Sequence, residues 1–203
     1  MSEHELLNVY DASGAIVGMQ TRREAQATGF AAGAVQLLLV GPDGRVLLQR
    51  RREDKENGGL WDKSVGGHVL AGESFDEALV REANEELFGR ADAGRVALAA
   101  GLDEAATHGF AVTARRIRLE LGLRDIRYAA PPEGGIINVI YHAAMYLGRT
   151  DLPIEGFAPQ EEELAGLAYF ERAEIDRMLV TGRLAPNMGF LWFALAGATA
   201  RRH

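Results

Sequence analysis

The sequence of 203 residues contains no cysteine, which excludes disulfide bonds, thiolate metal sites and a cysteine nucleophile. It has no apolar run approaching about 18 residues, and its first residues lack the basic and then apolar pattern of a secretion signal. We therefore expect a cytoplasmic protein that does not enter a membrane. Basic residues are few, 22 against 29 acidic ones, so a net charge of −7 offers no general attraction for nucleic acid.

The length suits one well-buried core, so we predict a single domain over residues 1–203, which could assemble as a homodimer. In residues 1–30 we expect a β-hairpin around the turn Asp11–Gly14, followed by a helix whose capping box runs from Thr21 to Glu24. Pattern alone indicates an α+β protein. Further strands are predicted at residues 34–40, 46–50, 126–129, 136–146 and 167–170, and helices at residues 172–179 and 187–198.

One stretch is longer than an ordinary connection between elements. Residues 90–123 are rich in alanine, and we predict that they are mostly helical. Residues 89–114 would then form a helical insertion.

Acidic residues gather on one predicted helix in the middle of the chain. Ser74 and Glu77 have the spacing of a capping box, so the helix should begin at about Phe75, directly after a glycine-rich turn. Farther along, at i, i+3 and i+4 spacing, three carboxylates fall on one face, and they repel one another unless a cation joins them. Hard oxygen ligands of this kind suit Mg²⁺ or Mn²⁺. The three are Glu82, Glu85 and Glu86.

The complete spacing fixes six positions: Gly67, Glu73, Arg81, Glu82, Glu85 and Glu86. A chance match of six positions in a chain this short is very rare. The stretch resembles the Nudix box, the signature of Mg²⁺-dependent hydrolases whose substrates carry a diphosphate linked to another moiety. The resemblance implies an α/β/α sandwich with a mixed sheet.

The end of the box departs from the family pattern, which continues with one variable residue, a glycine and an aliphatic residue. Those last two places hold Phe88 and Gly89 here. Residues 114–123 read like a second ending of the box, with Glu120 where the last glutamate would fall.

Two alignments of the metal helix follow from this. In the first, the helix covers residues 75–88, and an inserted helical excursion returns the chain at Leu121. In the second, the helix breaks near Arg81 and resumes at Arg115, which leaves Glu120 as the single aligned acid. We favour the first because it keeps three carboxylate ligands.

Residues upstream of the box, 46–51 and 60–68, resemble the isopentenyl-diphosphate isomerase branch of the Nudix superfamily and its hydrolase relatives. In that branch an arginine and a lysine contact the diphosphate. Arg51 and Lys55 match them if one residue is deleted before Trp61, although an exposed strand end would account equally well for a cluster of arginines.

Isomerase chemistry is poorly supported. True isomerases of this type use a cysteine where this chain has Gly66, and they bind metal through histidines, of which His68 matches one. Residues 30–33 offer no histidine, and the region of Asn138 lacks the expected catalytic glutamate. His68 is counted with the substrate-binding candidates, and it is equally consistent with a structural role.

The leading hypothesis is Mg²⁺- or Mn²⁺-dependent hydrolysis of an organic diphosphate, a nucleoside diphosphate linked to another moiety or a similar compound, by metal-activated water. The resemblance implies that Glu82, Glu85, Glu86 and the carbonyl of Gly66 bind the metal. It also implies that Glu73 and Arg81 hold the helix and loop in register, and we count these two with Glu82 and Glu85 among the catalytic residues.

The general base is left open, because clustered carboxylates share protons. Glu85 is one candidate, and residues 161–163, three glutamates, are another. A second hypothesis is a non-catalytic Nudix-fold module that binds a ligand. An isopentenyl-diphosphate isomerase is a third and weaker one.

Overall fold

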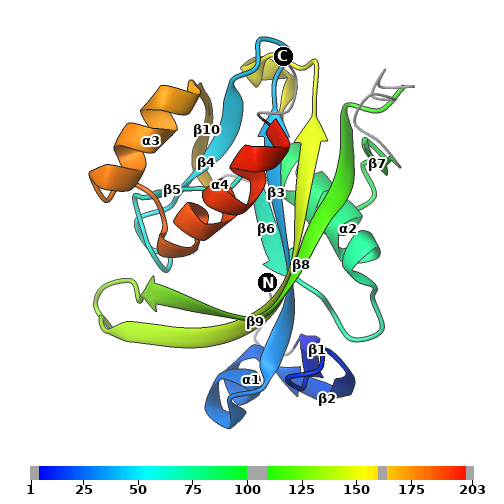
Figure 1. The fold of residues 1–203 in the computed structure, drawn as a ribbon, viewed down its shortest axis with the longest axis vertical. Coiled ribbons are helices and arrows are strands. Elements are labelled where there is room, and N and C mark those ends of the chain that lie inside the picture. The colour runs from blue at the N-terminus through cyan, green and yellow to red at the C-terminus, as the bar shows by residue number, and fades with distance from the viewer. Residues whose placement is uncertain (1–4, 100–108, 160–163, 200–203) are drawn as a thin grey trace.

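The computed structural model describes residues 5–99, 109–159 and 164–199. Four α-helices, one 3₁₀ turn and ten strands lie in these residues (Figure 1). The strands are β1 (Leu6–Tyr10), β2 (Ile16–Thr21), β3 (Ala31–Val40), β4 (Val46–Arg51), β5 (Trp61–Asp62), β6 (Val65–His68), β7 (Val96–Leu98), β8 (Val112–Tyr128), β9 (Ile136–Arg149) and β10 (Leu164–Phe170). The helices are α1 (Arg22–Thr28), α2 (Phe75–Phe88), α3 (Arg172–Val180) and α4 (Pro186–Thr199), and the 3₁₀ turn is η1 (Ile154–Gly156).

The strands form one curled mixed sheet, whose main path runs β10–β4–β3–β9–β8–β7. Strands β3 and β9 are parallel, whereas β8 and β9 are antiparallel. Strand β3 also pairs with β1 and β6, so the N-terminal hairpin and the segment leading into α2 both attach to the same central strand. This shared attachment brings distant parts of the sequence to one place.

Helices cover both faces of the sheet: α2 lies on one face, and α3 and α4 lie on the other (Figure 1). Successive strand residues point to opposite faces, so Leu37 packs with Leu79 of α2 while Leu38 packs with Trp192 of α4. The mixed α/β fold expected from the sequence is therefore present. No helix in the described ranges is both long and apolar enough to cross a membrane.

Several local predictions are confirmed by the elements that form. The hairpin β1–β2 and helix α1 occupy the first 30 residues, and Thr21 and Glu24 make the reciprocal hydrogen bonds of a capping box. The predicted strands β3, β4, β9 and β10 and helices α3 and α4 are also present, with ends that differ by a few residues. Whether residues 1–203 form a single domain stays a prediction.

The helical prediction for residues 90–123 is wrong wherever the structure describes them. They contain β7 and the first two thirds of β8, and residues 100–108 lie outside the described part. Alanine, arginine, leucine and glutamate all favour helices by intrinsic propensity, which suggested a helix. The run from Ile117 to Leu123 nevertheless places an apolar residue at every second position, the period of a strand, and pairing with β9 decides the outcome.

The second alignment of the metal helix is wrong for the same reason. Residues 115–120 belong to β8, where Glu120 pairs with Ala143 of β9 and forms an ion pair with Arg118 of its own strand. The inserted excursion of the first alignment, expected to be helical and to return the chain at Leu121, contains β7 and the first part of β8 in the described residues.

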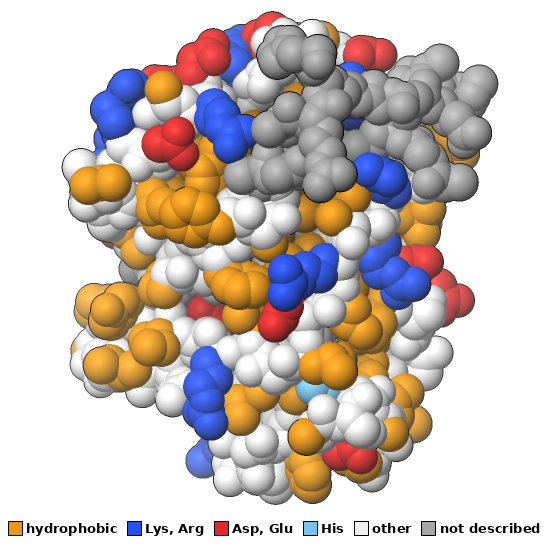
Figure 2. All heavy atoms as spheres, viewed as in Figure 1, with side chains coloured by type: hydrophobic (Ala, Val, Ile, Leu, Met, Phe, Trp, Pro, Cys, Tyr) orange, Lys and Arg blue, Asp and Glu red, His pale blue; other side chains and the backbone are white. Residues whose placement is uncertain are grey.

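Strands β8 and β9 continue past the rest of the sheet as a long bent hairpin, called here the β8–β9 arm (Figure 1). The bend coincides with a register shift between Glu120 and Leu123, where Gly122 has a positive φ of 69°. His142 fixes this place, because its Nδ1 accepts from the Gly122 amide at 2.9 Å and its Nε2 donates to the Asp11 carbonyl at 2.6 Å. Hydrophobic side chains gather over the end of the arm (Figure 2).

Candidate active site

Helix α2 is fixed at both ends by its local sequence. The Ser74 hydroxyl accepts from the Glu77 amide, and the Glu77 carboxylate accepts from the Ser74 amide at 2.8 Å, so the helix begins at Phe75 as predicted. Gly89 ends it in the left-handed conformation, with φ 76°. Phe88, the departure from the family pattern, stacks on Phe157 with ring centroids 5.8 Å apart. The unusual end of the box is therefore a cap and a core contact.

Arg81 connects the helix to the preceding loop. Its Nε and Nη2 donate to the two oxygens of Glu73 at 2.7 and 2.9 Å, and Nη2 also donates to the His68 carbonyl at 2.9 Å. Its Nη1 lies 2.9 Å from Glu82 Oε1 and 3.2 Å from Glu85 Oε2. The two hydrogen bonds between Arg81 and Glu73 form a bidentate pair. This pair is partly buried and therefore holds a defined geometry. Arg81 and Glu73 thus have the contacts that a positioning role requires.

Glu82 lies against the glycine turn before the helix. A Cβ atom added at Gly67 would fall 1.9 Å from Glu82 Cδ, so a glycine is required for the carboxyl group to occupy this place. Burial raises the pKa of Glu82, and the charge of Arg81 opposes that rise.

Glu86 lies one turn farther along α2, and its Oε2 accepts from the Gly66 amide at 3.1 Å. Burial, followed by the negative charge of Glu82, holds the pKa of Glu86 well above its usual range. Part of the Glu86 side chain is nevertheless exposed, because it lines a pocket. Two carboxylates that repel each other in a partly dry site are a suitable donor pair for a hard cation.

No three His, Asp or Glu side chains of the described residues lie close enough together to hold a metal ion as they stand. The donor chemistry still fits a divalent cation, since Glu82 and Glu86 are oxygen ligands whose mutual repulsion a cation would relieve. Glu82 and Glu85 both pair with Arg81 and do not line the pocket, whereas Glu86 does line it.

The pocket beside Glu86 has a volume of about 370 Å³ and lies between β3, β6, the loop after β4, α1 and the β8–β9 arm. Of the residues predicted from the sequence, Gly66, His68, Glu86, Arg51 and Lys55 line it. The structure therefore brings the three substrate-binding candidates to the same pocket as two of the proposed metal ligands, Gly66 and Glu86. Glu73, Arg81, Glu82 and Glu85 do not line it.

Five cations line this pocket: Arg22, Arg51, Lys55, Lys63 and Arg127. Sequence reasoning missed Arg22, Lys63 and Arg127. Arg22 comes from α1 and Arg127 from the β8–β9 arm, and Glu56 joins them through ion pairs of 2.7 and 3.2 Å. Nothing in the local sequence marks these residues, since their meeting depends on chain pairing across more than 70 positions.

The side of the pocket formed by β3, β6 and β9 is polar and tightly packed. His68 is 6% exposed, and burial, followed by the positive charge of Arg22, holds its pKa well below the usual range. Its ring meets that of Tyr141 edge to face at 5.6 Å. Within the described residues, His68 Nδ1, the Tyr141 hydroxyl and Gln36 Oε1 have no hydrogen-bond partner. A neutral imidazole at this place can donate a hydrogen bond from one ring nitrogen and accept one at the other.

Two further side chains of the described residues do not line the pocket. Trp192 packs in the core, and its Nε1 donates to Asp176 at 2.8 Å, which excludes it from the pocket wall. Asn138 of β9 does not line the pocket, although its neighbour Ile137 does. The glutamates at 161–163, considered as a source of the base, lie outside the described residues.

Comparison with known proteins agrees with this geometry. A model of the NUDIX domain matches residues 30–188. An uncharacterized Nudix hydrolase of Streptomyces coelicolor is 40% identical over 87 residues, which cover 42% of this chain and 48% of that protein. An isopentenyl-diphosphate Delta-isomerase of Leifsonia xyli is 47% identical over 58 residues, covering 28% of this chain and 31% of that enzyme. The chain thus spans about half the length, or less, of these curated relatives.

A crystal structure from Deinococcus radiodurans has a similar fold, with a TM-score of 0.62, coverage of 98% of this chain and 100% of that one, and 18% identity. At that identity the likeness concerns the fold alone. The family match covers more than half of the chain and includes all of α2 and most of the pocket-lining residues. The chain therefore belongs to the Nudix domain family.

Proposed function

We propose that this protein is a Mg²⁺- or Mn²⁺-dependent hydrolase of a small organic diphosphate. The observation that carries the proposal is the position of Glu86, a carboxylate of the Nudix helix, in the wall of a pocket that five cations also line. Carboxylates that suit a divalent cation and side chains that suit phosphate oxygens thus meet at one place. A pocket of about 370 Å³ is large enough for a small molecule.

The metal would be held by Glu82, Glu85 and Glu86 and by the carbonyl oxygen of Gly66. When bound, such an ion neutralises phosphoryl oxygens and lowers the pKa of a coordinated water. Glu82 and Glu85 would each have to exchange an ion pair with Arg81 for the metal. Any of the three glutamates could accept the proton of the attacking water, because coupled carboxylates share protons.

The chain's own residues would orient the substrate. Arg51 and Lys55 would bind diphosphate oxygens, and His68 would donate or accept a hydrogen bond at the buried wall. Glu73 and Arg81 would keep α2 and the glycine turn in register, so that Glu86 stays beside Gly66. By keeping these groups in place, the protein holds the attacking water in line with the phosphorus atom, which is its main contribution to the reaction.

The isomerase alternative is weaker, although isopentenyl-diphosphate Delta-isomerases are among the relatives. Position 66 is glycine, so the thiol that those enzymes need is missing. A ligand-binding module without catalysis is the second candidate, and its ligand binding would be independent of Mg²⁺.

A substrate panel tests the proposal. The purified protein should release phosphate-containing products from at least one compound among nucleotide sugars, dinucleoside polyphosphates, nucleoside triphosphates and prenyl diphosphates, and only with Mg²⁺ or Mn²⁺. A folded protein that turns over none of them contradicts the proposal. Calorimetric binding that is unchanged by Mg²⁺, without product, would favour the binding module, and isomerised prenyl diphosphate would favour the isomerase.

A further inference from the structure

Lys63 lies in the short connection between β5 and β6 and was not among the residues expected in the site. It is 4% exposed, and its Nζ lies 3.0 Å from Asp62 Oδ1. Even so, Lys63 lines the pocket together with Gly66 and Glu86. A lysine held this firmly next to a pocket presents a fixed positive charge, which an exposed lysine does not.

Asp62 holds a second pocket cation in the same way. Arg51 Nη1 lies 3.3 Å from Asp62 Oδ2, so the two oxygens of one carboxylate anchor two cations. Asp62 is 2% exposed and does not line the pocket, whereas Arg51 and Lys63 do. Asp62 carries one negative charge, and Arg51 and Lys63 carry one positive charge each. Because the two cations line the pocket and Asp62 does not, the net positive charge of the three groups lies at the pocket wall.

Gly66 provides the space for this arrangement. A Cβ atom at position 66 would fall 2.1 Å from Lys63 Cε and 3.0 Å from its Cδ. The Lys63 side chain therefore occupies the volume that any side chain at position 66 would need. Because the clash is with the far end of a flexible side chain, a larger residue at position 66 would displace the ammonium group while leaving the backbone intact.

We propose that Lys63 binds a phosphoryl oxygen of the substrate, with Arg51 as its partner and buried Asp62 as the group that positions both. The inference rests on the proposed function in taking a diphosphate as the ligand. Lys63 supplies charge and a hydrogen bond to that anion and takes no part in proton transfer. Lys63 can then reach the pocket beside Arg51 only because position 66 is a glycine.

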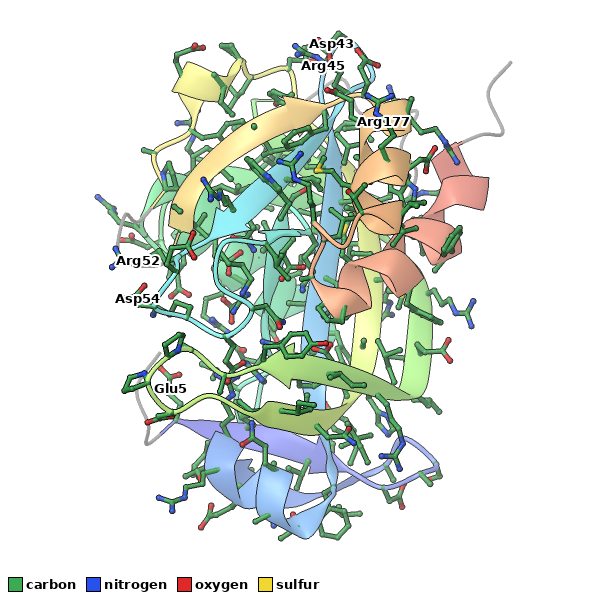
Figure 3. All side chains as sticks on the ribbon, turned by 90° about the vertical axis from the view of Figure 1, so that its left-hand side faces the viewer. Glu5, Asp43, Arg45, Arg52, Asp54 and Arg177 are labelled. Carbon is green, nitrogen blue, oxygen red and sulfur yellow. The ribbon has the colours of Figure 1, made fainter. Side chains whose placement is uncertain are left out.

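Inorganic pyrophosphate is the probe, titrated calorimetrically into the full chain with and without Mg²⁺. Lys63→Met keeps the aliphatic volume and removes the charge, and it should weaken pyrophosphate binding about tenfold or more, as expected for loss of a charged hydrogen bond. Arg45→Met is the matched control. Arg45 pairs with Asp43 at the far end of the β3–β4 hairpin. Figure 3 shows this pair away from Arg52 and Asp54, of which Asp54 lines the pocket. The Arg45→Met variant should bind pyrophosphate as tightly as the original protein does.

Gly66→Ala gives a second test, whose measurement in the original background also applies if Lys63→Met fails to fold. It should weaken pyrophosphate binding in the original background, because it displaces Lys63, and change it little when Lys63 is already methionine. Equal losses in both backgrounds, or undiminished binding by Lys63→Met, would overturn the inference, as would an original protein that does not bind pyrophosphate.

The proposed hydrolase activity and the proposed role of Lys63 can each be refuted without the other. Hydrolysis by the original protein with unaltered pyrophosphate binding in Lys63→Met would leave the enzyme and remove the role of Lys63. Pyrophosphate binding that depends on Lys63, in a protein that hydrolyses no diphosphate, would keep the role of Lys63 and remove the enzyme.

Discussion

Glu85 and Glu86 are neighbours on α2, yet their carboxylates have different surroundings. Glu86 meets the Gly66 amide and the pocket, whereas Glu85 pairs with Arg81. We expect Glu86→Gln to lower kcat/KM by about 100-fold or more, since a catalytic metal supplies several kcal/mol of stabilisation. Glu85→Gln should also reduce turnover sharply. Steady-state kinetics measure both, circular dichroism checks the fold, and unchanged rates in the two variants would refute the metal assignment.

The lowered pKa of Asp62 makes the free energy of unfolding depend on pH. Burial raises its pKa, but the charges of Lys63 and Arg51 outweigh burial and bring the pKa to about 2, below the ordinary 3.8. A carboxyl group with a lowered folded pKa stabilises the protein above its unfolded pKa and loses that contribution as the pH falls through the folded value. The difference corresponds to about 2 kcal/mol, lost between about pH 4 and pH 2.

Urea unfolding of the original protein and of Asp62→Asn, at about pH 6 and at about pH 2.5, measures this contribution. The original protein should lose more stability on acidification than the variant does. Parallel losses in the two proteins would mean that Asp62 contributes nothing to acid sensitivity.

The residues that could be predicted from the sequence are those whose roles follow from local spacing. Glu73, Arg81 and Glu82 stand within ten positions of one another, and one helix turn and one ion-pair network place them. Arg22 and Arg127 could not be predicted, because only the pairing of β1 with β3 and of β8 with β9 brings them to Glu56. Lys63 was adjacent to the motif but became informative only once its burial and its clash with a Cβ at position 66 were known.

At the scale of elements, the termini of helices followed the sequence closely. Capping boxes placed the starts of α1 and α2, since a cap is decided by residues three positions apart. The first part of strand β8, up to residue 123, was missed because its residues favour helices individually and only their alternation favours a strand. Where propensity and periodicity disagree, pairing with a long neighbour such as β9 settles the matter.

The end of α2 offers a test at this scale. Gly89 has φ 76°, a conformation that costs an L-residue about 1 kcal/mol, so Gly89→Ala should lower stability by that amount and Tm by about 2–4 °C. Gly18→Ala is the control. Gly18 has an ordinary φ, and a Cβ there would meet Val9 at an ordinary 3.8 Å, so it should be neutral. Calorimetric melting compares the two, and equal effects would count against the cap.

At the scale of the whole molecule, metal binding should raise the melting temperature Tm. A cation that binds only the folded state adds about 2.7 kcal/mol at roughly 100 times its Kd. In a protein of this size that raises Tm by about 5–10 °C. Scanning calorimetry with Mg²⁺ or Mn²⁺, against sodium chloride at matched ionic strength, measures the shift.

Glu86→Gln should show a much smaller shift, and Arg45→Met should keep the full one. An equal rise in Tm for Glu86→Gln and the original protein would show that the cation binds elsewhere. The predicted homodimer belongs to the same scale, and sedimentation velocity decides it.

Arg22 belongs to α1, which ends before residue 30, where the family match begins. The pocket is therefore assembled from a part shared with the family and a part that precedes it. In evolutionary terms the two parts can diverge at different rates. On the proposed function, replacing the first 29 residues would alter the pocket wall at Arg22 and leave the acids of α2 in place.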